Sequence, residues 1–338
     1  MSRFGTTLGR FLQEEQLKHP DLDPGIGPLL TQMAYASKII GREVGRAALV
    51  GKLGLMGEKN ATGDSQKKLD VFGSETVLDA FSSTGLVYAM VSEEVEDLLA
   101  IEGGENSDYV VCCDPLDGSS NTDINGSVGT IFGFWRRIPG ASLQENALRK
   151  GSDQFLAGYV MYSTSTLLVY ATQHGVHGFT LDRELGEFLL SHENIRCPQR
   201  GHYYSANLGH SHEWTVGVRN YLQWVTADDK ATHKPYSLRY TGALVADLHR
   251  SLVDGGLYFY PPDPSHPDGK LRLLYECAPL GYVVEKAGGR VSTGTEPVLE
   301  ITAKTIHARC PLVIGSADDV AEYEHFVSGP TLRARTTA

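Results

Sequence analysis

The sequence predicts an α/β (or α+β) protein with two lobes. Apolar residues recur at helical spacing over residues 28–50, whereas "DYVVCCD" and "GVHGFTLD" are β-rich segments bounded by turns. The chain has 338 residues, 41% of them hydrophobic, which is enough for a large core and most consistent with two lobes. The polar sequence near residues 190–200 places a boundary between lobes 1–195 and 196–338.

The elements expected in the first lobe alternate between helices and strands. The N-terminal segment "MSRFGTTLGRFLQEEQLKHP" is polar and predicts a short amphipathic helix, ahead of the helix at 28–50. A further helix is expected over residues 74–84 with Ser74 as its N-cap. Strands follow at "LVYAMVSEE" and "DYVVCCD", and "AGYVMYSTSTLLVYAT" with "GVHGFTLD" predicts an antiparallel sheet. The polar residues 138–154 are expected to form a surface loop.

The second lobe repeats this mixture of helices and strands. The segment "YTGALVADLHRSLVDGG" predicts a helix, because its leucine and valine residues share one face and glycine ends it. "LYFYP" predicts a strand, and "LRLLYECAPLGYVVEKAGG" predicts a helix that stops at Gly288.

Composition excludes several classes of protein. The formal net charge of −11 gives an acidic surface that repels nucleic acid and anionic membranes, so neither is an expected partner. No run of about 18 apolar residues occurs, and no membrane span is expected. The N-terminus does not resemble a signal peptide, and the five cysteines lack CxxC spacing. Reduced thiols and a cytoplasmic location are therefore expected.

Carboxylates stand beside glycine or at expected strand ends in four separated stretches. They are Asp64 and Asp70, Glu93 and Glu94, Asp114 and Asp117, and Glu276. Carboxylates held side by side repel one another, and a hard cation such as Mg²⁺, which takes oxygen ligands, removes that cost. This pattern predicts a metal site.

The stretch "DPLDGSS" carries the strongest signal. Asp114 and Asp117 are three residues apart, and the intervening proline stiffens the turn and leaves the Leu116 carbonyl free as an oxygen ligand. The residues that follow offer backbone N–H groups with little steric cover: Gly118, Ser119 and Ser120. Such amides suit a phosphate. The stretch therefore predicts metal ligands that lead into a phosphate cradle.

With "SEE" upstream and "GKLRLLYE" downstream, "DPLDGSSN" resembles the class I fructose-1,6-bisphosphatases. These belong to the lithium-sensitive, magnesium-dependent phosphatase superfamily, which also holds the inositol monophosphatases. The resemblance covers nearly the whole chain, including "GTIFG", "RYTGALVADLHR", "EKAGG" and "GSADDV". It implies a layered αβαβα sandwich. The implied reaction is hydrolysis of the 1-phosphate of fructose 1,6-bisphosphate to fructose 6-phosphate, in gluconeogenesis or carbon fixation.

The resemblance also implies roles for individual residues. Two to three Mg²⁺ ions per subunit, or Mn²⁺ as a substitute, would be held by Glu93, Asp114, the carbonyl of Leu116, Asp117 and Glu276. Asp64 would help to hold the third ion. Glu94 and Asp70 would accept the proton of the attacking water. Most metal ligands would thus lie in the first lobe, with Glu276 in the second.

Substrate contacts follow from the same resemblance. The 1-phosphate would lie over the amides of Gly118, Ser119 and Ser120, beside Asp117. The 6-phosphate would be bound by Asn207, Arg239, Tyr240, Tyr260 and Lys270. His210 stands where relatives have a tyrosine, and whether it donates to the phosphate stays open. In the family, the arginine matching Arg239 reaches a neighbouring subunit's site, which implies at least a dimer and usually a homotetramer.

Regulation is where the chain departs from the family pattern. Gly27, Tyr109 and Arg136 match part of an AMP site, but the loop is "PGIGPLL" and Asp108 replaces a lysine. A negative charge toward the nucleotide phosphate predicts weak or absent AMP inhibition. Residues 138–154 contain no cysteine, so thioredoxin control is not expected.

Two alternatives remain open. Sedoheptulose 1,7-bisphosphate could be the substrate, alone or in addition, since the same residues would serve it. A non-catalytic, metabolite-binding protein could also keep this fold. The full set of seven acids argues against that alternative, because a scaffold has no need of mutually repelling carboxylates.

Overall fold

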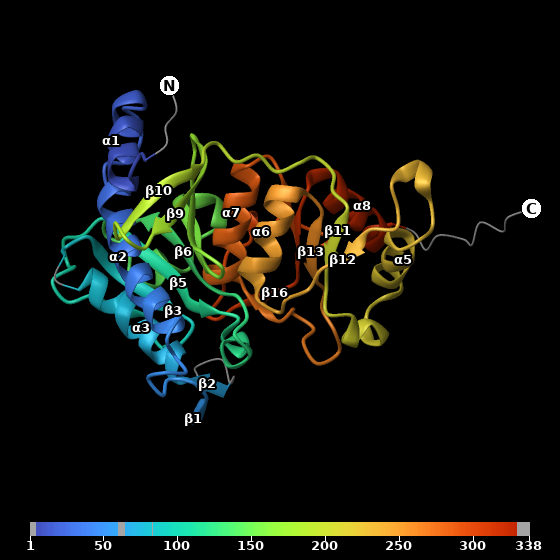
Figure 1. Cartoon of the computed structure of the whole chain (residues 1–338), viewed down its shortest axis with the longest axis horizontal. Helices are drawn as coiled ribbons and strands as arrows, with labels where there is room; N and C mark the ends of the chain where they lie inside the picture. Colours follow the sequence, from blue (N-terminus) through green and yellow to red (C-terminus); the bar gives the residue numbers. More distant parts are fainter. Residues whose placement is uncertain (1–4, 60–64, 83, 330–338) are drawn as a thin grey trace, which may run out of the picture.

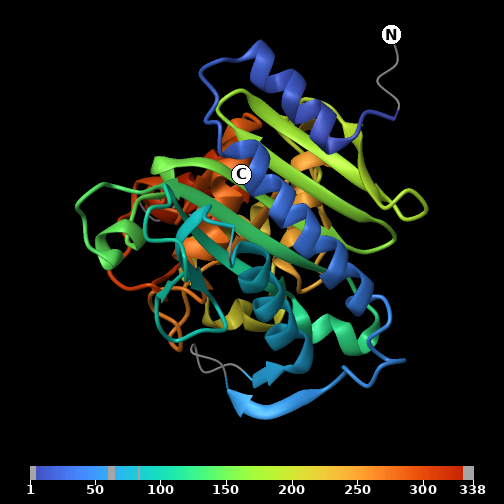
Figure 2. The same cartoon turned by 90° about the vertical axis from the view of Figure 1, so that its left-hand side faces the viewer.

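A computed structural model describes residues 5–59, 65–82 and 84–329, which form five layers (Figure 1). Helices α1 (Leu8–Lys18), α2 (Ile26–Val44) and α3 (Lys68–Phe81) form the first layer and cover one face of an eight-stranded sheet (Figure 2). The strands of this sheet are β3 (Val87–Ser92), β4 (Leu99–Ala100), β5 (Tyr109–Asp117), β6 (Val128–Arg136), β7 (Gln154–Tyr162), β8 (Thr166–Thr172), β9 (Gly175–Asp182) and β10 (Glu187–His192). Their spatial order is β10-β9-β8-β7-β6-β5-β3-β4, and only β3 and β5 pair in parallel within it.

The remaining layers come from the second part of the chain. Helices α6 (Leu244–Asp254) and α7 (Ala278–Lys286) lie between the two sheets, and α5 (Val216–Val225) and α8 (Ala317–Ser328) cover the far side (Figure 1). The second sheet has the order β12-β11-β13-β17-β15, with strands β11 (Tyr203–Ser205), β12 (Ser237–Leu238), β13 (Leu257–Tyr260), β15 (Arg290–Ser292) and β17 (Leu312–Gly315). The αβαβα sandwich implied by the resemblance is confirmed.

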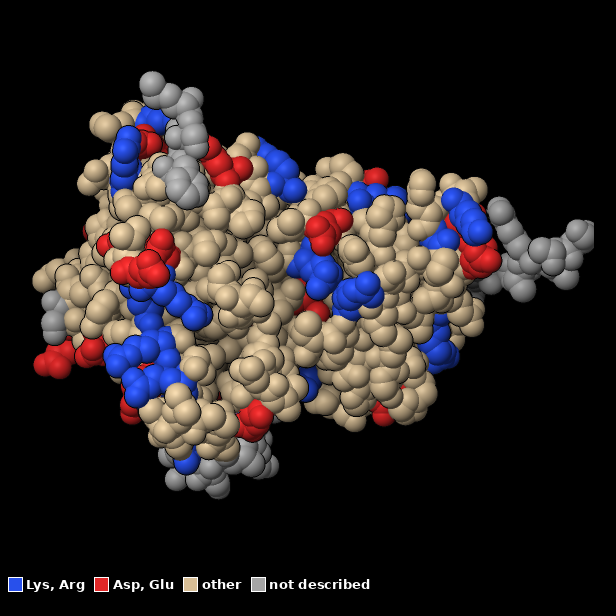
Figure 3. All heavy atoms as spheres, in the orientation of Figure 1, with Lys and Arg blue, Asp and Glu red and all other residues tan. Residues whose placement is uncertain are grey.

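Short elements complete the chain. A hairpin of β1 (Leu55–Lys59) and β2 (Ser65–Lys67) precedes α3, and β14 (Leu271–Arg272) pairs with β16 (Arg309–Cys310). Among the described residues, no helix combines the length and apolar character needed to cross a lipid bilayer. On the face shown in Figure 3, acidic and basic side chains lie next to one another along the length of the molecule.

Alternating side chains of the large sheet form two separate cores. In β6, Phe132 and Phe134 pack with the helices of the first layer, whereas Ile131 and Trp135 pack on the side of α6 and α7. This period of two is what a strand buried on both faces requires. A third core fills the space between the second sheet, α5 and α8, where Tyr221 contacts Phe259 edge-on at a ring distance of 5.8 Å.

Helix boundaries differ from those expected. The helix expected at 28–50 begins at Ile26 and ends at Val44. Beyond it the backbone tightens into turns, in which Arg46 donates to the carbonyl of Glu43 and Ala47 to that of Val44. Such i→i+3 bonds are common where a helix ends.

Ser74 is not a helix N-cap. Helix α3 begins six residues earlier, and the carboxylate of Asp70 accepts a hydrogen bond from the backbone N–H of Lys67 at 2.8 Å. Ser74 lies buried inside the helix, where its hydroxyl contacts that of Ser92 at 3.2 Å. Asp70, in the first turn, therefore satisfies a backbone N–H group at the start of α3, the role that was expected of Ser74.

Two further expectations were incomplete. Residues 138–154 include a short helix, α4 (Leu143–Ala147), whose N-cap Ser142 accepts from the N–H of Glu145. The helix expected over "LRLLYECAPLGYVVEKAGG" starts as strand β14 and a single π-helical stretch, Leu273–Cys277, before α7 begins. Single π turns inside helices often mark functional sites.

Candidate active site

One cavity of about 530 Å³ brings together most of the predicted site residues. It lies where β5 ends, and it is lined from the first part of the chain as well as from β13, β14 and the start of α6. The predicted residues in its wall are Asp70, Glu93, Glu94, Asp114, Leu116, Asp117, Gly118, Ser119, Ser120, Asn207, Tyr240, Tyr260, Lys270 and Glu276.

Three buried carboxylates form the centre of this cavity. Asp114 and Asp117 lie at the end of strand β5, and Glu276 lies in the π-helical stretch before α7. One oxygen of each lies within 4.8 Å of the others. Oxygen atoms so arranged are the ligands that Mg²⁺ and similar hard cations prefer.

The electrostatics of this cluster favour a bound cation. Burial raises the pKa of Asp114 far above its usual range, and the nearby charges of Glu93 and Asp117 raise it further. Burial is also the main cause that raises the pKa values of Asp117 and Glu276. A cation among the three carboxylates would reverse these shifts, because opposite charge stabilises the ionised form.

Asp70 gives a second indication that the cavity binds a water molecule or an ion. One of its oxygens caps α3, as described above, while Oδ1 is buried without a hydrogen bond of good geometry, although the Ser119 hydroxyl lies near enough to lower the pKa of the carboxyl. Burial raises the pKa of this carboxyl. An unsatisfied buried acceptor is costly, so a water molecule or an ion is expected beside it. The residues present therefore fit a metal-assisted hydrolytic site.

Arg272 is a residue of the site that sequence reasoning missed. Its Nη2 lies 3.2 Å from Oε1 of Glu93, and both side chains are largely buried. Its backbone N–H donates to Glu276. The arginine therefore joins two predicted metal ligands. The sequence signal was its place in "GKLRLLYE", but nothing local indicated the ion pair.

Asp247 was also missed. Its two carboxylate oxygens accept from the backbone N–H of Thr241 at 2.9 and 3.0 Å, and one accepts from Gly242 at 3.3 Å. These bonds hold the loop that presents Tyr240 to the cavity. Burial raises the pKa of Asp247 to about 6. An acid in the first turn of a predicted helix is the signal that could have found it.

The cradle after Asp117 depends on glycine. Gly118 has a φ of +73°, a left-handed conformation that L side chains rarely adopt. A Cβ there would lie 2.5 Å from the Cβ of Ala243. The backbone then turns into the 3₁₀ stretch Ser119–Ile124, so the amides of its first turn lack intrahelical partners and can face an anion.

Another part of the cavity wall supplies hydrogen-bond donors and the positive charge of Lys270. Lys270 Nζ lies 6.0 Å from the ring centroid of Tyr260. Burial, with the charges of Asp247 and Asp117 among the further causes, raises the pKa of Tyr240 to about 12, so its hydroxyl keeps its proton. Asn207 completes this wall. Neutral hydroxyl and amide donors beside an ammonium group are of the kind that bind an anion.

Two of the described residues predicted to bind metal or substrate, His210 and Arg239, do not line this cavity. His210 lies in the 3₁₀ stretch Leu208–Glu213, with Nδ1 at 3.2 Å from Oε2 of Glu213, and it lines a smaller crevice. Arg239 is exposed, and its guanidinium donates to the carbonyl of Leu238. Asp64 lies outside the described residues.

Two of the residues assigned to a degenerate AMP site meet at Asp23. The Tyr109 hydroxyl donates to Asp23 Oδ1 and Arg136 Nε to Oδ2, each at 2.5 Å. The third, Gly27, lies in the first turn of α2 and lines a separate crevice of about 320 Å³. The cationic group that would face a nucleotide phosphate is therefore already paired within the chain.

Comparison with known proteins decides the family. The model of the fructose-1-6-bisphosphatase N-terminal domain matches residues 6–193, and that of the C-terminal domain matches residues 197–328. The chain belongs to the fructose-1,6-bisphosphatase family. The expected resemblance is confirmed, and the chain is a phosphatase of this family.

Individual relatives agree with the family models. A class 1 fructose-1,6-bisphosphatase of Acaryochloris marina is 51% identical over 329 residues, which cover 97% of this chain and 98% of that protein. Another, of Chlorobium chlorochromatii, is 47% identical over 326 residues, covering 96% and 98%. The crystal structure of Leishmania major fructose-1,6-bisphosphatase in holo form has a TM-score of 0.89 at 36% identity and covers 96% of this chain and 99% of that chain.

Proposed function

We propose that this chain hydrolyses the 1-phosphate of fructose 1,6-bisphosphate to fructose 6-phosphate in a magnesium-dependent reaction. The observation that carries the proposal is the shared cavity. Within it, the buried acids Asp114, Asp117 and Glu276 stand beside the amide cradle, and Tyr240 and Lys270 line another part of the same wall. A substrate with a phosphate at each end fits this division. The names of the relatives support the same substrate.

The acidic cluster would hold two to three Mg²⁺ ions per subunit, with Mn²⁺ as a substitute. The ligands in this proposal are Glu93, Asp114, the carbonyl of Leu116, Asp117 and Glu276, with Asp64 assisting a third ion. When bound, such ions neutralise phosphate oxygens and generate a nucleophile from water. The raised pKa values of the buried carboxyls support this assignment, since they reflect repulsion and burial that a cation would offset.

The chain's own residues would perform the remaining tasks. The amides of Gly118, Ser119 and Ser120 bind the 1-phosphate and fix its orientation. Glu94 and Asp70 accept the proton of the attacking water, a contribution of about 10²–10⁴-fold in rate. The free Oδ1 of Asp70 supports its part in this step.

At the far end, the 6-phosphate would contact Asn207, Tyr240, Tyr260 and Lys270. Tyr240 remains a neutral donor because its pKa is raised to about 12. His210 forms a pair with Glu213 and lies at the edge of this region, so we assign it at most a peripheral contact.

Arg239 supports an oligomeric enzyme. Its side chain does not line the cavity of its own subunit and is exposed, as expected of a residue that serves a neighbouring site. We infer a homotetramer, or at least a dimer, in which lobe 1–195 supplies most metal ligands and lobe 196–338 the sugar-phosphate contacts. Sedimentation velocity of the full chain checks this, and a monomer at micromolar concentration would contradict it.

Phosphate release tests the reaction itself. We expect turnover of fructose 1,6-bisphosphate with Mg²⁺, turnover with Mn²⁺, and loss of activity in EDTA that added Mg²⁺ restores. A parallel assay with sedoheptulose 1,7-bisphosphate distinguishes the alternative substrate, which would win if its kcat/KM were higher. Binding of either sugar phosphate without phosphate release in Mg²⁺ would favour the non-catalytic alternative.

A further inference from the structure

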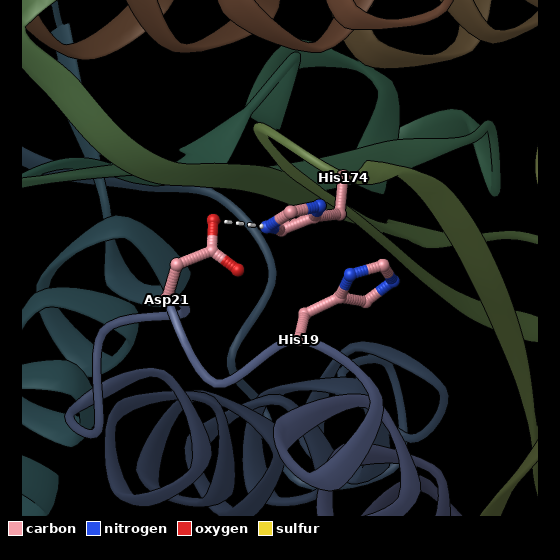
Figure 4. A group of neighbouring side chains, drawn as sticks. All are labelled: His19, Asp21 and His174. Atoms are coloured by element: carbon pink, nitrogen blue, oxygen red, sulfur yellow. Dashed lines mark hydrogen bonds and ion pairs between the residues drawn. The ribbon is translucent and has the colours of Figure 1, made fainter.

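Three side chains of types that can bind a metal ion lie close together, on elements that contribute no residue to the acidic cluster. His19 directly follows α1, Asp21 lies in the connection to α2, and His174 lies in the turn between β8 and β9. Figure 4 shows the two imidazole rings and the carboxylate gathered around a common space. One ligand atom of each residue lies within 4.8 Å of those of the other two.

Contacts between these residues already hold the group in place. Oδ2 of Asp21 lies 2.9 Å from Nε2 of His174 and accepts a second bond, of 2.7 Å, from Gln173. The rings of His19 and His174 stack with centroids 3.9 Å apart and an angle of 19° between their planes. This arrangement brings together residues 153 positions apart in the sequence, Asp21 and His174.

Glu15 places a buried carboxylate next to His19. Its side chain is buried, and its Oε2 lies 3.7 Å from Nε2 of His19. That distance exceeds hydrogen-bond range, so Glu15 contributes negative charge beside the His19 ring without fixing its tautomer.

The donor set differs in kind from that of the active site. Asp114, Asp117 and Glu276 offer oxygen only, which suits Mg²⁺. Two imidazoles with one carboxylate suit zinc, copper and nickel, and disfavour magnesium. Asp21 is 60% exposed at its side chain, whereas His174 is 21% exposed, so an ion can enter from solvent and keep water ligands.

We propose that His19, Asp21 and His174 form a second, peripheral site for a divalent transition-metal ion of the zinc class. Ligand atoms around tetrahedral Zn²⁺ stand roughly 3.3 Å apart, given metal–nitrogen distances of about 2.0–2.1 Å. The ligand atoms of this group, all within 4.8 Å of one another, can reach that spacing through side-chain torsions of these partly exposed residues. The proposal does not depend on the proposed function.

A metal ion at this site would fasten the first layer to the sheet. The N-terminal end of α1 is already joined to β10, where Leu190 donates to the carbonyl of Thr6 at 2.8 Å. The ion would join the other end of α1 to the β8–β9 turn. Because it binds only the folded arrangement, it stabilises that arrangement by mass action. We expect the midpoint of thermal unfolding to rise by roughly 2–5 °C at saturation.

Zinc binding to the full chain tests the site. Equilibrium dialysis against Zn²⁺ with millimolar Mg²⁺ present should give one more tightly held Zn²⁺ per chain in the unaltered protein than in the double variant His19→Ala/His174→Ala. Asp21→Asn should lower the affinity for that ion at least tenfold, since the variant lacks the charged ligand. Co²⁺ in place of Zn²⁺ should give visible absorption bands of a nitrogen-ligated ion, absent in the double variant.

Matched variants separate this site from the others. His212→Ala removes an exposed histidine elsewhere and should leave the extra ion in place. Asp117→Asn impairs the acidic cluster and should also leave it, even if phosphatase activity disappears. Should the double variant prove unstable, Asp21→Asn alone carries the test. Equal zinc stoichiometry and affinity in the unaltered and variant proteins would overturn the proposal, as would a loss caused equally by His212→Ala.

Discussion

Asp117 accepts a hydrogen bond of 2.8 Å from the backbone N–H of Val245. A second bond, of 3.2 Å, comes from Leu244, so the carboxylate caps the start of α6. The two segments are 128 residues apart, and the positive end of the helix dipole faces the acid. The acidic cluster is thus positioned from the second half of the chain before any ion is bound.

Asp117→Asn should abolish most activity while the fold persists. The amide oxygen can still accept one backbone bond, but the negative charge in the cluster is lost. Because metal ions contribute several kcal/mol to catalysis, we expect kcat/KM to fall by at least about 10³-fold. Phosphate release from fructose 1,6-bisphosphate measures the loss, and circular dichroism reports the fold.

Asp254→Asn is the matched control for this variant. It changes an exposed acid at the other end of the same helix, 4.0 Å from Arg250, and should leave the rate unaltered. If Asp117→Asn retained more than about a tenth of the activity, the assignment of this carboxylate to the metal site would be wrong.

Arg272→Met should destabilise the metal-free protein strongly. The substitution leaves Glu93, which is 14% exposed at its side chain, without its cationic partner. Breaking a buried ion pair in this way costs about 3–5 kcal/mol of unfolding free energy. Urea denaturation in EDTA measures the change. The exposed pair of Arg10 with Glu14 gives the control, because Arg10→Met should cost less than about 1 kcal/mol.

A double-mutant cycle tells loss of charge pairing from loss of packing. Adding Glu93→Leu to Arg272→Met removes the uncompensated charge, so much of the lost stability should return in EDTA. Additive losses in the double variant would mean that the ion pair itself contributes little.

The layered fold could be predicted because the family motifs implied it, and β-rich segments separately indicated an antiparallel sheet. Phe132, Ile131 and their neighbours alternate in a way that only a strand buried on both faces requires. The ends of helices were harder to predict from the sequence. Whether Asp70 or Ser74 capped α3 depended on the preceding hairpin and on the contact of Ser74 with Ser92, neither of which is visible in the local sequence.

The acids of the site were visible because each stands at the end of an element, where side chains of several segments meet. Their supporting residues were not. Arg272 acts through Glu93, from a distant part of the sequence, and Asp23 acts through Arg136. Long-range ion pairs leave no periodic pattern and no motif of their own, so sequence reasoning found the ligands and missed their partners.

Millimolar AMP should leave the phosphatase rate unchanged. Arg136 and Tyr109 both donate to Asp23, whose side chain is 7% exposed, so an internal carboxylate already occupies these donors. A nucleotide phosphate would have to displace the charge-assisted bond between Arg136 and the buried carboxylate of Asp23. Burial and the charge of Asp23 raise the pKa of Tyr109, which keeps its hydroxyl a donor to that carboxylate.

Asp23→Ala checks the reason for this insensitivity. Without the carboxylate, Arg136 carries an unpaired charge that an anion can satisfy, so calorimetry should detect tighter AMP binding in the variant than in the unaltered chain. Strong AMP inhibition of the unaltered enzyme would contradict the prediction. If neither the unaltered chain nor the variant bound AMP, the insensitivity would have another cause, for example the loop at Gly27.

His249 should make the protein sensitive to acid. Its Nδ1 lies 2.7 Å from the Tyr159 hydroxyl, and burial, followed by the charge of His192, lowers its pKa from 6.5 to about 4. Between these two values the unfolded chain binds a proton that the folded chain does not. The contribution of neutral His249 to the unfolding free energy is therefore fully present above pH 6.5, and it is lost as the pH drops toward about 4.

Chemical denaturation at several pH values measures this slope. His249→Gln keeps a hydrogen-bonding side chain but cannot titrate, so its unfolding free energy should fall less over the same interval, by roughly 2–3 kcal/mol. Comparing the two proteins cancels the other titrating groups, which both share. His212→Gln, at a histidine 75% exposed, should follow the unaltered chain. Parallel curves for the unaltered chain and His249→Gln would show that this imidazole is protonated without penalty in the folded state, and that its burial beside Tyr159 does not set the acid limit.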